Sequence, residues 1–293
     1  MPAPMRIVEV GPRDGLQNEA QIIPTDVKIA FVDALSRSGV DEVEVSAFVS
    51  HPKIPQLSDA EEVFAAIKRV AGVVYSALVP NERGLERALE AGANKVSVFT
   101  AASETFNKKN INATITEAYA RFVPVLAGSQ RARIKNRAYV STCFWCPYEG
   151  KVPAASAARV ILRLLDMGFE EVSIGDTIGK ATPDEVRELL ELVVPHTTAG
   201  RLALHLHDTY GRAADNVLAG LALGVTEFDA STGGIGGCPY APGAAGNLAT
   251  ETLVRTLTEA GARVTVDLAV LDEARRAVRG HLGERRSQPA APA

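Results

Sequence analysis

RIVEV at residues 6–10, followed directly by GPRDG at 11–15, is the stretch that decides the fold. A short run rich in Val and Ile that ends at glycine and proline is typical of a buried strand. An open dinucleotide-binding sheet would carry G-x-G-x-x-G immediately after such an early strand. Here Pro12, Arg13 and Asp14 stand in that place. The turn therefore argues against an open nucleotide-binding sheet and leaves a closed barrel as the alternative.

Seven more runs of this kind follow along the chain. They are DEVEVS (41–46), VVYSAL (73–78), KVSVFT (95–100), RAYVSTC (137–143), EVSIG (171–175), LALHLH (202–207) and TEFDAS (226–231). Amphipathic stretches with helix-start signals, such as Thr182-Pro183-Asp184-Glu185, lie between them. Alternating strands and helices imply right-handed parallel crossovers, and about eight units in roughly 250 residues favour closure. We predict an α/β fold, a (β/α)8 TIM barrel, as a single domain over residues 1–283.

The C-terminal region adds two expectations. An amphipathic stretch at about 266–282 predicts an additional helix packed on the outside of the barrel. The last ten residues, ERRSQPAAPA (284–293), are typical of a disordered tail.

Composition limits the classes of function. The chain has 293 residues, is 46% hydrophobic and carries a formal net charge of −4, with basic residues scattered among acidic ones. This pattern offers no electrostatic footprint for nucleic acid or an anionic membrane, so a small-molecule partner is expected. We find no run of about 18 apolar residues and no signal-peptide pattern at the start, and we expect a cytoplasmic protein. Cys143, Cys146 and Cys238 form neither an even disulfide set nor a four-ligand zinc pattern, as expected in a reducing compartment.

Polar residues gather where the predicted strands end. In barrels of this kind the chemistry collects at the C-terminal ends of the strands. The residues found there are Arg13, Asp14, Glu44, Ser46, Asp176, Thr177, His205, His207, Asp208 and, after a glycine-rich segment, Asn247. This end of the barrel is therefore the predicted site.

His205-Leu206-His207 is the most informative motif. Residues two apart on a strand point to the same side, so both imidazoles would enter the barrel together. A pair of histidines held by hydrogen bonds would explain this motif alone equally well. Asp14 adds an anionic oxygen and Asn247 a carbonyl oxygen, and two nitrogens with two oxygens suit an octahedral Mg²⁺ or Mn²⁺ ion with open positions. We predict a catalytic divalent-metal site rather than a closed structural zinc site.

Three further side chains have two interpretations each. Arg13 is either half of a surface salt bridge or a fixed fork of donors for a developing oxyanion at the barrel mouth. Glu44 lies among apolar neighbours and therefore needs a cation, a donor or a metal-bound water, so it is either an ion-pair partner or a functional group. Asp176 in SIGDTIG either contacts substrate or caps the next helix, and a supporting role is favoured.

The segment from Thr232 to Asn247 carries six glycines and two prolines, which suits a mobile lid, although a plain surface loop has the same composition. Cys238 lies within it and could move a proton over the substrate. Cys143-Phe144-Trp145-Cys146 imitates a redox C-x-x-C motif without the surrounding thioredoxin-like pattern, so redox chemistry is not expected. The unclustered histidines are expected to be surface or packing residues: His51, His196 and His281.

Several longer motifs point to one family. VEVGPRDGLQNE (8–19), FTAASETFNKKNIN (99–112), SIGDTIG (173–179), LHLHDTYGRAADN (204–216) and above all GGIGGCPYAPGAAGNLATE (233–251) resemble the hydroxymethylglutaryl-CoA lyases, within the wider group of metal-dependent barrel lyases and acyl transferases. The resemblance covers about residues 5 to 260. It implies cleavage of 3-hydroxy-3-methylglutaryl-CoA (HMG-CoA) to acetoacetate and acetyl-CoA, as in leucine breakdown and ketone-body chemistry, and a homodimer.

The same resemblance assigns roles to individual residues. It implies the metal ligands Asp14, His205, His207 and Asn247, the catalytic group Arg13, the active-site positions Gln17 and Glu44, and the loop cysteine Cys238. Asp14 or a base that it orients would remove the hydroxyl proton, and Cys238 or His205 would deliver the final one.

The chain also departs from the family pattern. Thr142 stands where cysteine is frequent, Trp145 where glycine is frequent, and His51-Pro52 alters the usual S-P-K stretch. Because these positions lie near the barrel mouth, the alternative is a related lyase or aldolase acting on another 3-hydroxyacyl-CoA or hydroxy-oxo acid. A non-catalytic metal-binding barrel is the interpretation from a different class.

Overall fold

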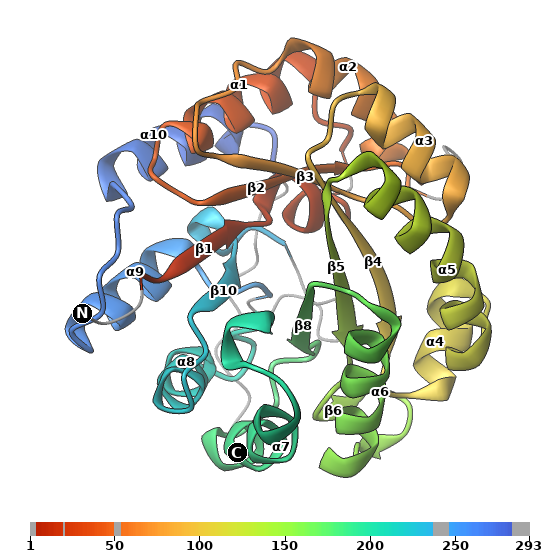
Figure 1. Ribbon diagram of the computed structural model, residues 1–293. Coiled ribbons are helices and arrows are strands. Elements are labelled where there is room, and N and C mark those ends of the chain that lie inside the picture. Colours follow the sequence, from red (N-terminus) through yellow and green to blue (C-terminus); the bar gives the residue numbers. More distant parts are fainter. Residues whose placement is uncertain (1–3, 20, 50–53, 237–245, 283–293) are drawn as a thin grey trace.

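The computed structural model describes residues 4–19, 21–49, 54–236 and 246–282. Eight parallel strands close into a barrel in the order β1-β10-β9-β8-β5-β4-β3-β2, with helices around them (Figure 1). The barrel strands are β1 (Arg6–Glu9), β2 (Glu42–Ala47), β3 (Val74–Leu78), β4 (Lys95–Ala101), β5 (Lys135–Ser141), β8 (Glu171–Asp176), β9 (Leu202–Leu206) and β10 (Glu227–Ala230). Each overlaps one of the eight predicted runs. The predicted (β/α)8 barrel is confirmed.

The helices lie where the amphipathic stretches predicted them. They are α1 (Thr25–Ser36), α2 (Ala60–Ala66), α3 (Glu82–Glu90), α4 (Glu104–Ile111), α5 (Ile115–Ala132), α6 (Ala154–Met167), α7 (Pro183–Val193), α8 (Ala213–Ala222), α9 (Thr250–Glu259) and α10 (Leu268–Arg279). Thr182 closes a full capping box on α7, because its side chain accepts from the N–H of Glu185 and the Glu185 carboxylate accepts from the N–H of Thr182. None of the described helices is long and apolar enough to cross a membrane.

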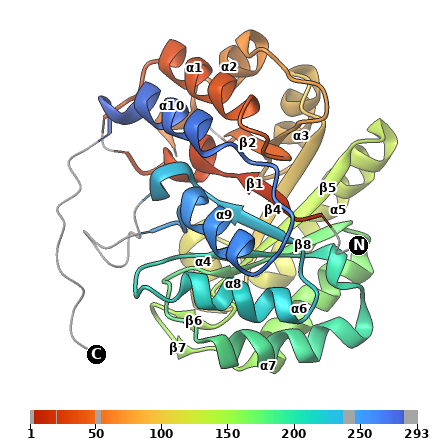
Figure 2. The same cartoon turned by 90° about the vertical axis from the view of Figure 1, so that its left-hand side faces the viewer.

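Three features extend the basic pattern. A short antiparallel hairpin, β6 (Trp145–Cys146) with β7 (Gly150–Lys151), follows β5. The connection from β4 to β5 holds two helices, α4 and α5. The additional C-terminal helix is present as α10, which lies on the outside of the barrel against α1 (Figure 2). Residues 284–293, for which we predict a disordered tail, lie outside the described residues.

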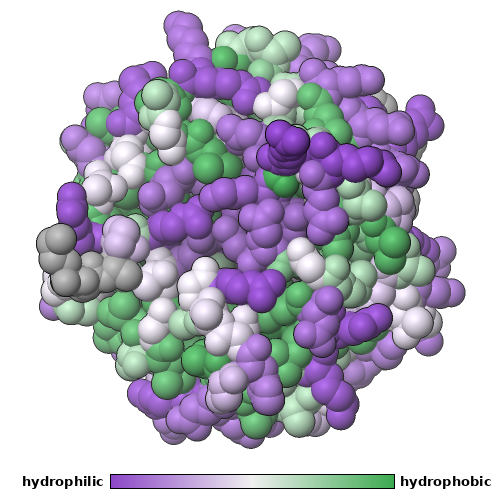
Figure 3. All heavy atoms as spheres, viewed as in Figure 1, coloured by the Kyte–Doolittle hydropathy of each residue, from purple (hydrophilic) through white to green (hydrophobic). Residues whose placement is uncertain are grey.

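Alternation along the strands separates an apolar layer from a charged interior. Ile7, Val43 and Phe228 are fully buried in one core with Phe31 and Leu35 of α1. The residues next to them in sequence face the barrel axis, since β-strand side chains alternate between the two sides. Several of these are charged, and Figure 3 shows hydrophilic side chains gathered over the middle of the ring of strands. The barrel interior is therefore an ionic core, and the site lies at one end of it.

Candidate metal and active site

Arg13 and Asp14 lie on a single turn of π-helix, Gly11–Gly15, that follows β1. The N–H groups of Asp14 and Gly15 both donate to the Val10 carbonyl, at 2.8 and 3.2 Å. The segment is thus a tight helical turn that presents both side chains at the end of the strand. A Cβ atom at Gly15 would lie 3.1 Å from both the Ile235 carbonyl oxygen and the Ser231 hydroxyl. A side chain there would crowd the chain that follows β10, on which the turn packs directly.

The side chains of His205 and His207 lie beside that of Asp14, as predicted. His205 is on β9, and His207 comes just after it, in a bridge with Asn247. The imidazole centroids are 5.4 Å apart. One ligand atom from each of Asp14, His205 and His207 lies within 4.8 Å of the others. The structure therefore brings three of the four predicted ligands into one cluster.

Asn247, the fourth predicted ligand, lies against Asp14. Its amide nitrogen donates to Asp14 Oδ2 at 2.9 Å and to the Ile235 carbonyl at 3.2 Å. To act as a ligand it would present its amide oxygen instead. All four predicted ligands are thus neighbours, although they come from opposite ends of the chain.

These side chains fit a divalent cation. The His207 Nδ1 atom is buried without a hydrogen-bond partner among the described residues, which costs free energy unless something else uses its lone pair. A carboxylate, an amide oxygen and two imidazoles form a mixed oxygen and nitrogen set that suits Mg²⁺ or Mn²⁺ and leaves positions for substrate.

The surroundings of Asp14 and His207 favour the protonation states that metal binding requires, whereas at His205 the carboxylates of Asp229 and Asp14 outweigh burial and raise the pKa. Burial disfavours the charged form of Asp14, but Arg13 and the two imidazoles outweigh it and lower its pKa to about 2. Burial and the neighbouring His205 lower the pKa of His207 to about 4. An ionised carboxylate and a neutral imidazole are the states in which these groups bind metals.

Arg13 is held in place by two carboxylates. Its Nε atom donates to Glu44 at 2.6 Å, and one terminal nitrogen donates to Asp14 at 2.6 Å. Glu44 also accepts from the Ser97 hydroxyl at 2.7 Å, and the guanidinium lies 5.3 Å from the centroid of the Tyr139 ring. Of the two interpretations of Arg13, a simple surface salt bridge is excluded because the side chain is only 7% exposed. Glu44 has the cationic partner that its burial requires.

Gln17 and Asp176 differ in their relation to the site. Gln17 donates to Asp14 Oδ1 at 2.9 Å and so supports the ligand cluster directly. Asp176 is fully buried and accepts from the backbone N–H groups of Lys180 and Ala181, each at 3.1 Å. Burial raises the pKa of Asp176 to about 7. The helix cap that we considered for it belongs to Thr182 instead, so Asp176 organises the turn before α7.

Two carboxylates, the fully buried Glu9 and the half-buried Glu251, hold the ends of the glycine-rich segment. Glu9 accepts from the N–H of Thr232, the first residue of the segment, at 2.9 Å and from the Thr250 hydroxyl, just after the segment, at 2.7 Å. Glu251 accepts from the Gly233 N–H at 2.8 Å. Both ends are therefore fixed to the barrel. Cys238 lies outside the described residues.

Glu9 leads to a pH-dependent prediction. Burial raises its pKa to about 8, against 4.5 for an ordinary glutamate. Between these values the folded protein holds a proton that the unfolded chain has released, so stability should fall as the pH rises from about 5 to 8. Glu9→Gln should reduce that fall by about 1.4 kcal/mol per pH unit. Urea unfolding at several pH values measures it. Identical pH dependence in both proteins would show that Glu9 is ionised throughout.

The cysteines within the described residues have structural partners. Cys143 and Cys146 are buried thiols that lie near the Val140 carbonyl and the Ser103 hydroxyl, at 3.0 and 3.1 Å. Burial raises the pKa of Cys143 to about 12, which makes a reactive thiolate unfavourable.

Thr142 and Trp145 lie beside them. Thr142 has a φ of 55°, which is unusual for a branched residue. The Trp145 indole donates to Glu185 at 3.3 Å, and Lys180 Nζ lies 4.3 Å from its ring centroid. The exposed His196 lies away from the cluster, as predicted; His51 lies outside the described residues.

Sequence reasoning missed Asp229, Arg137 and Tyr139, which lie beneath the cluster. Asp229 Oδ2 is 3.3 Å from His205 Nδ1, and Asp229 Oδ1 accepts from Arg137 at 2.7 Å. A signal was available, because charged or polar residues two apart recur on several predicted strands, as in Glu227 with Asp229. Such pairs indicate that the inward side of the barrel is polar.

The fold and the cluster define the class: a parallel (β/α)8 barrel with a carboxylate and two imidazoles at its mouth, as in metal-dependent barrel enzymes. The HMGL-like family model matches residues 4–278. The mitochondrial hydroxymethylglutaryl-CoA lyase of Rattus norvegicus is 48% identical over 94% of this chain and 84% of its own. The cytoplasmic 3-hydroxy-3-methylglutaryl-CoA lyase of the same organism is 47% identical, over 94% and 80%.

Solved structures of hydroxymethylglutaryl-CoA lyases are also similar to this chain. The hydroxymethylglutaryl-CoA lyase of Pseudomonas aeruginosa superposes with a TM-score of 0.94 at 45% identity, covering 99% of this chain and 97% of that one. The HMG-CoA lyase of Acinetobacter baumannii, in complex with coenzyme A and 3-methylmalate, has a TM-score of 0.89 at 35% identity and full coverage of both chains. The chain belongs to the HMGL-like family.

Proposed function

We propose that this protein is a lyase that cleaves HMG-CoA to acetoacetate and acetyl-CoA by a metal-assisted retro-Claisen reaction. The observation that carries the proposal is the cluster of Asp14, His205 and His207 with Arg13 bonded to it, in a chain of this family. The names of the relatives supply the substrate.

Asp14, His205, His207 and Asn247 would hold the cation. A bound Mg²⁺ or Mn²⁺ would supply Lewis-acid chemistry, lowering the pKa of the substrate hydroxyl and fixing the substrate's orientation. We propose Mg²⁺ or Mn²⁺ as the cation because carboxylate and amide oxygens accompany the two imidazoles in the donor set. Gln17 and Glu44 support this arrangement from beside it, since Gln17 donates a hydrogen bond to Asp14 and Glu44 accepts one from Arg13 and so holds that guanidinium in place. Asp176, occupied by backbone donors, supports the neighbouring turn.

The reaction breaks the bond between C2 and C3 of the substrate. Asp14, or a base that it orients, removes the proton from the tertiary hydroxyl at C3, and the C3 oxygen becomes the ketone of acetoacetate. The electron pair of the broken bond moves onto the acetyl thioester as an enolate. Arg13, fixed by Glu44, stabilises the negative charge on the thioester oxygen with donors that need no rearrangement.

The enolate must then receive a proton on C2. Cys238 and His205 are the two candidates: Cys238 because a thiol on the glycine-rich segment could close over the substrate, and His205 because it lies in the cluster. Protonation gives acetyl-CoA and completes the balance of atoms.

Three finer assignments complete the proposal. The partner is an acyl-CoA, in line with the coenzyme A complex of the Acinetobacter relative. We propose a homodimer, on the family resemblance alone, which sedimentation would test. We propose a cytoplasmic location on the sequence alone. The names of the relatives do not decide between compartments, because both mitochondrial and cytoplasmic forms occur among them.

A substrate panel tests the proposal. Purified protein with Mg²⁺ should release acetyl-CoA from HMG-CoA with a kcat/KM well above that for other 3-hydroxyacyl-CoA thioesters and hydroxy-oxo acids. The panel should include thioesters that lack the 3-methyl group, because Thr142 and Trp145 depart from the family near the barrel mouth. A different preferred substrate would favour the related lyase or aldolase, and metal binding without any turnover would favour a non-catalytic barrel.

A further inference from the structure

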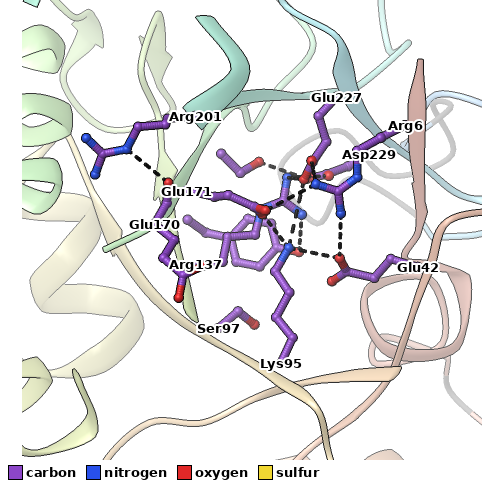
Figure 4. A network of polar contacts seen from close by, with 12 residues as sticks. Arg6, Glu42, Lys95, Ser97, Arg137, Glu170, Glu171, Arg201, Glu227 and Asp229 are labelled. Carbon is purple, nitrogen blue, oxygen red and sulfur yellow. Dashed lines mark hydrogen bonds and ion pairs between the residues drawn. The ribbon is translucent and has the colours of Figure 1, made fainter. Parts of the chain in front are cut away.

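Charged side chains from several strands meet inside the barrel in one network of polar contacts (Figure 4). The buried ones are Glu42, Lys95, Arg137, Glu171, Glu227 and Asp229, and the half-buried Arg6 pairs with them. Lys95 bonds to Glu42 at 2.8 Å, and Arg137 lies 3.4 Å from Glu227. None of these residues was assigned to the reaction above. One of them nevertheless contacts a metal ligand, so part of this ionic core can act on the site.

The contact runs from Arg137 through Asp229 to His205. Arg137 is fully buried and donates to Asp229 Oδ1 at 2.7 Å. The other carboxylate oxygen, Oδ2, accepts from the Ser173 hydroxyl at 2.8 Å and lies 3.3 Å from His205 Nδ1. Asp229 is therefore fixed from two other sides before it meets the imidazole, and its charge is balanced by a buried guanidinium.

The orientation of the His205 ring determines which of its two nitrogens carries the proton. Nδ1 faces Asp229, while Nε2 faces Asp14 at 3.8 Å. A carboxylate accepts a hydrogen bond, so the proton of a neutral His205 belongs on Nδ1 and the lone pair on Nε2, toward the predicted cation. His207 differs, because its Nδ1 atom has no hydrogen-bond partner among the described residues.

We propose that Asp229 is a positioning residue that fixes the orientation and tautomer of His205 and thereby sets the affinity of the site for its cation. Arg137 and Ser173 hold Asp229 in place for this role. The effect on metal affinity rests on the metal site proposed above. Partners of this kind to metal-bound histidines change metal affinity by about 10- to 100-fold when they are removed.

The proposal also narrows the choice of final proton donor. With its Nδ1 proton on Asp229 and its Nε2 lone pair on the side where Asp14 and the cation would lie, a neutral His205 would have no proton to give to the substrate carbon. The remaining candidate for that step is Cys238.

The first test measures Mn²⁺ binding by electron paramagnetic resonance in the full chain. Asp229→Asn should weaken binding by about 10- to 100-fold. Glu42→Gln is the matched control, because Glu42 is equally buried in the same ionic core but bonds to Lys95. It should bind Mn²⁺ within about twofold of the wild type. Unchanged binding in Asp229→Asn, or equal weakening in Glu42→Gln, would overturn the proposal.

The second test needs no metal. Nitrogen-15 NMR of histidine-labelled, metal-free protein at pH 8 should show the proton of neutral His205 on Nδ1, with the resonance assigned by His205→Gln. If Asp229→Asn fails to fold, Ser173→Ala replaces it as the milder variant, because it removes one hydrogen bond that supports Asp229. In Ser173→Ala the proton of neutral His205 should be found on Nδ1 in a smaller fraction of the molecules. A proton on Nε2 in the wild type would refute the positioning role. If the wild-type protein binds no Mn²⁺ in the first test, the metal site itself is refuted.

Discussion

Replacing Arg13 with Met should lower kcat by about 10³-fold while the protein still binds Mn²⁺. Loss of a preorganised donor to an oxyanion costs a factor of about this size. Arg13 is nearly fully buried and is held by Glu44 at 2.6 Å, so its guanidinium is set in position before substrate arrives. Methionine fills a similar volume without a charge or donors. Steady-state kinetics with HMG-CoA measures the loss.

Arg6→Met is the matched control for Arg13→Met. Arg6 also belongs to the barrel interior and pairs with carboxylates, including Glu227 at 2.8 Å, but it lies at the start of β1, away from the cluster. Its variant should turn over within a few-fold of the wild type. Near-normal turnover in Arg13→Met, or equal losses in both variants, would rule out a specific role for Arg13.

Among the proposed replacements, Lys95→Met should lower the free energy of unfolding the most. Lys95 is fully buried and bonds to Glu42 and Glu171, and Glu227 lies 3.9 Å from its ammonium group. Removing one partner of a buried ion pair costs about 3–5 kcal/mol, because the remaining charges lose their compensation. The loss should be smaller at pH 5 than at pH 8, since the carboxylates that lose their partner can then bind protons.

Lys135→Met provides the comparison. Lys135 is the register partner of Lys95 on the adjacent strand, but it is exposed. Its replacement should change the free energy of unfolding, measured in urea, by less than about 0.5 kcal/mol. Equal small effects in the two variants would mean that the ionic core contributes nothing to stability through Lys95.

The fold could be predicted because its signals are local. Each barrel strand is an apolar run bounded by turn residues, and the capping box at Thr182 and Glu185 marks a helix start within four residues of sequence. The count of strand and helix units then favoured a closed barrel. The π-helical turn at Gly11–Gly15 was not predictable in the same way, because it depends on contact with Ser231 and Ile235 far along the chain.

The site was predictable for a similar reason. The ends of parallel barrel strands meet at one rim, so Asp14, His205, His207 and Asn247 were expected together although they are distant in sequence. The contact between Arg137 and Asp229 was not, because it joins β5 to β10 across the barrel interior. Which inward residues meet there depends on the stagger of the strands, which no single motif reveals.

The most direct test of the account is turnover of HMG-CoA by protein stripped of divalent metal. The stripped protein should be inactive, and addition of Mg²⁺ or Mn²⁺ should restore release of acetyl-CoA and acetoacetate in equal amounts. His207→Ala should not respond to either ion at the same concentrations. Full turnover in the presence of excess chelator, or tight metal binding with no cleavage of HMG-CoA, would contradict the proposed metal-assisted lyase.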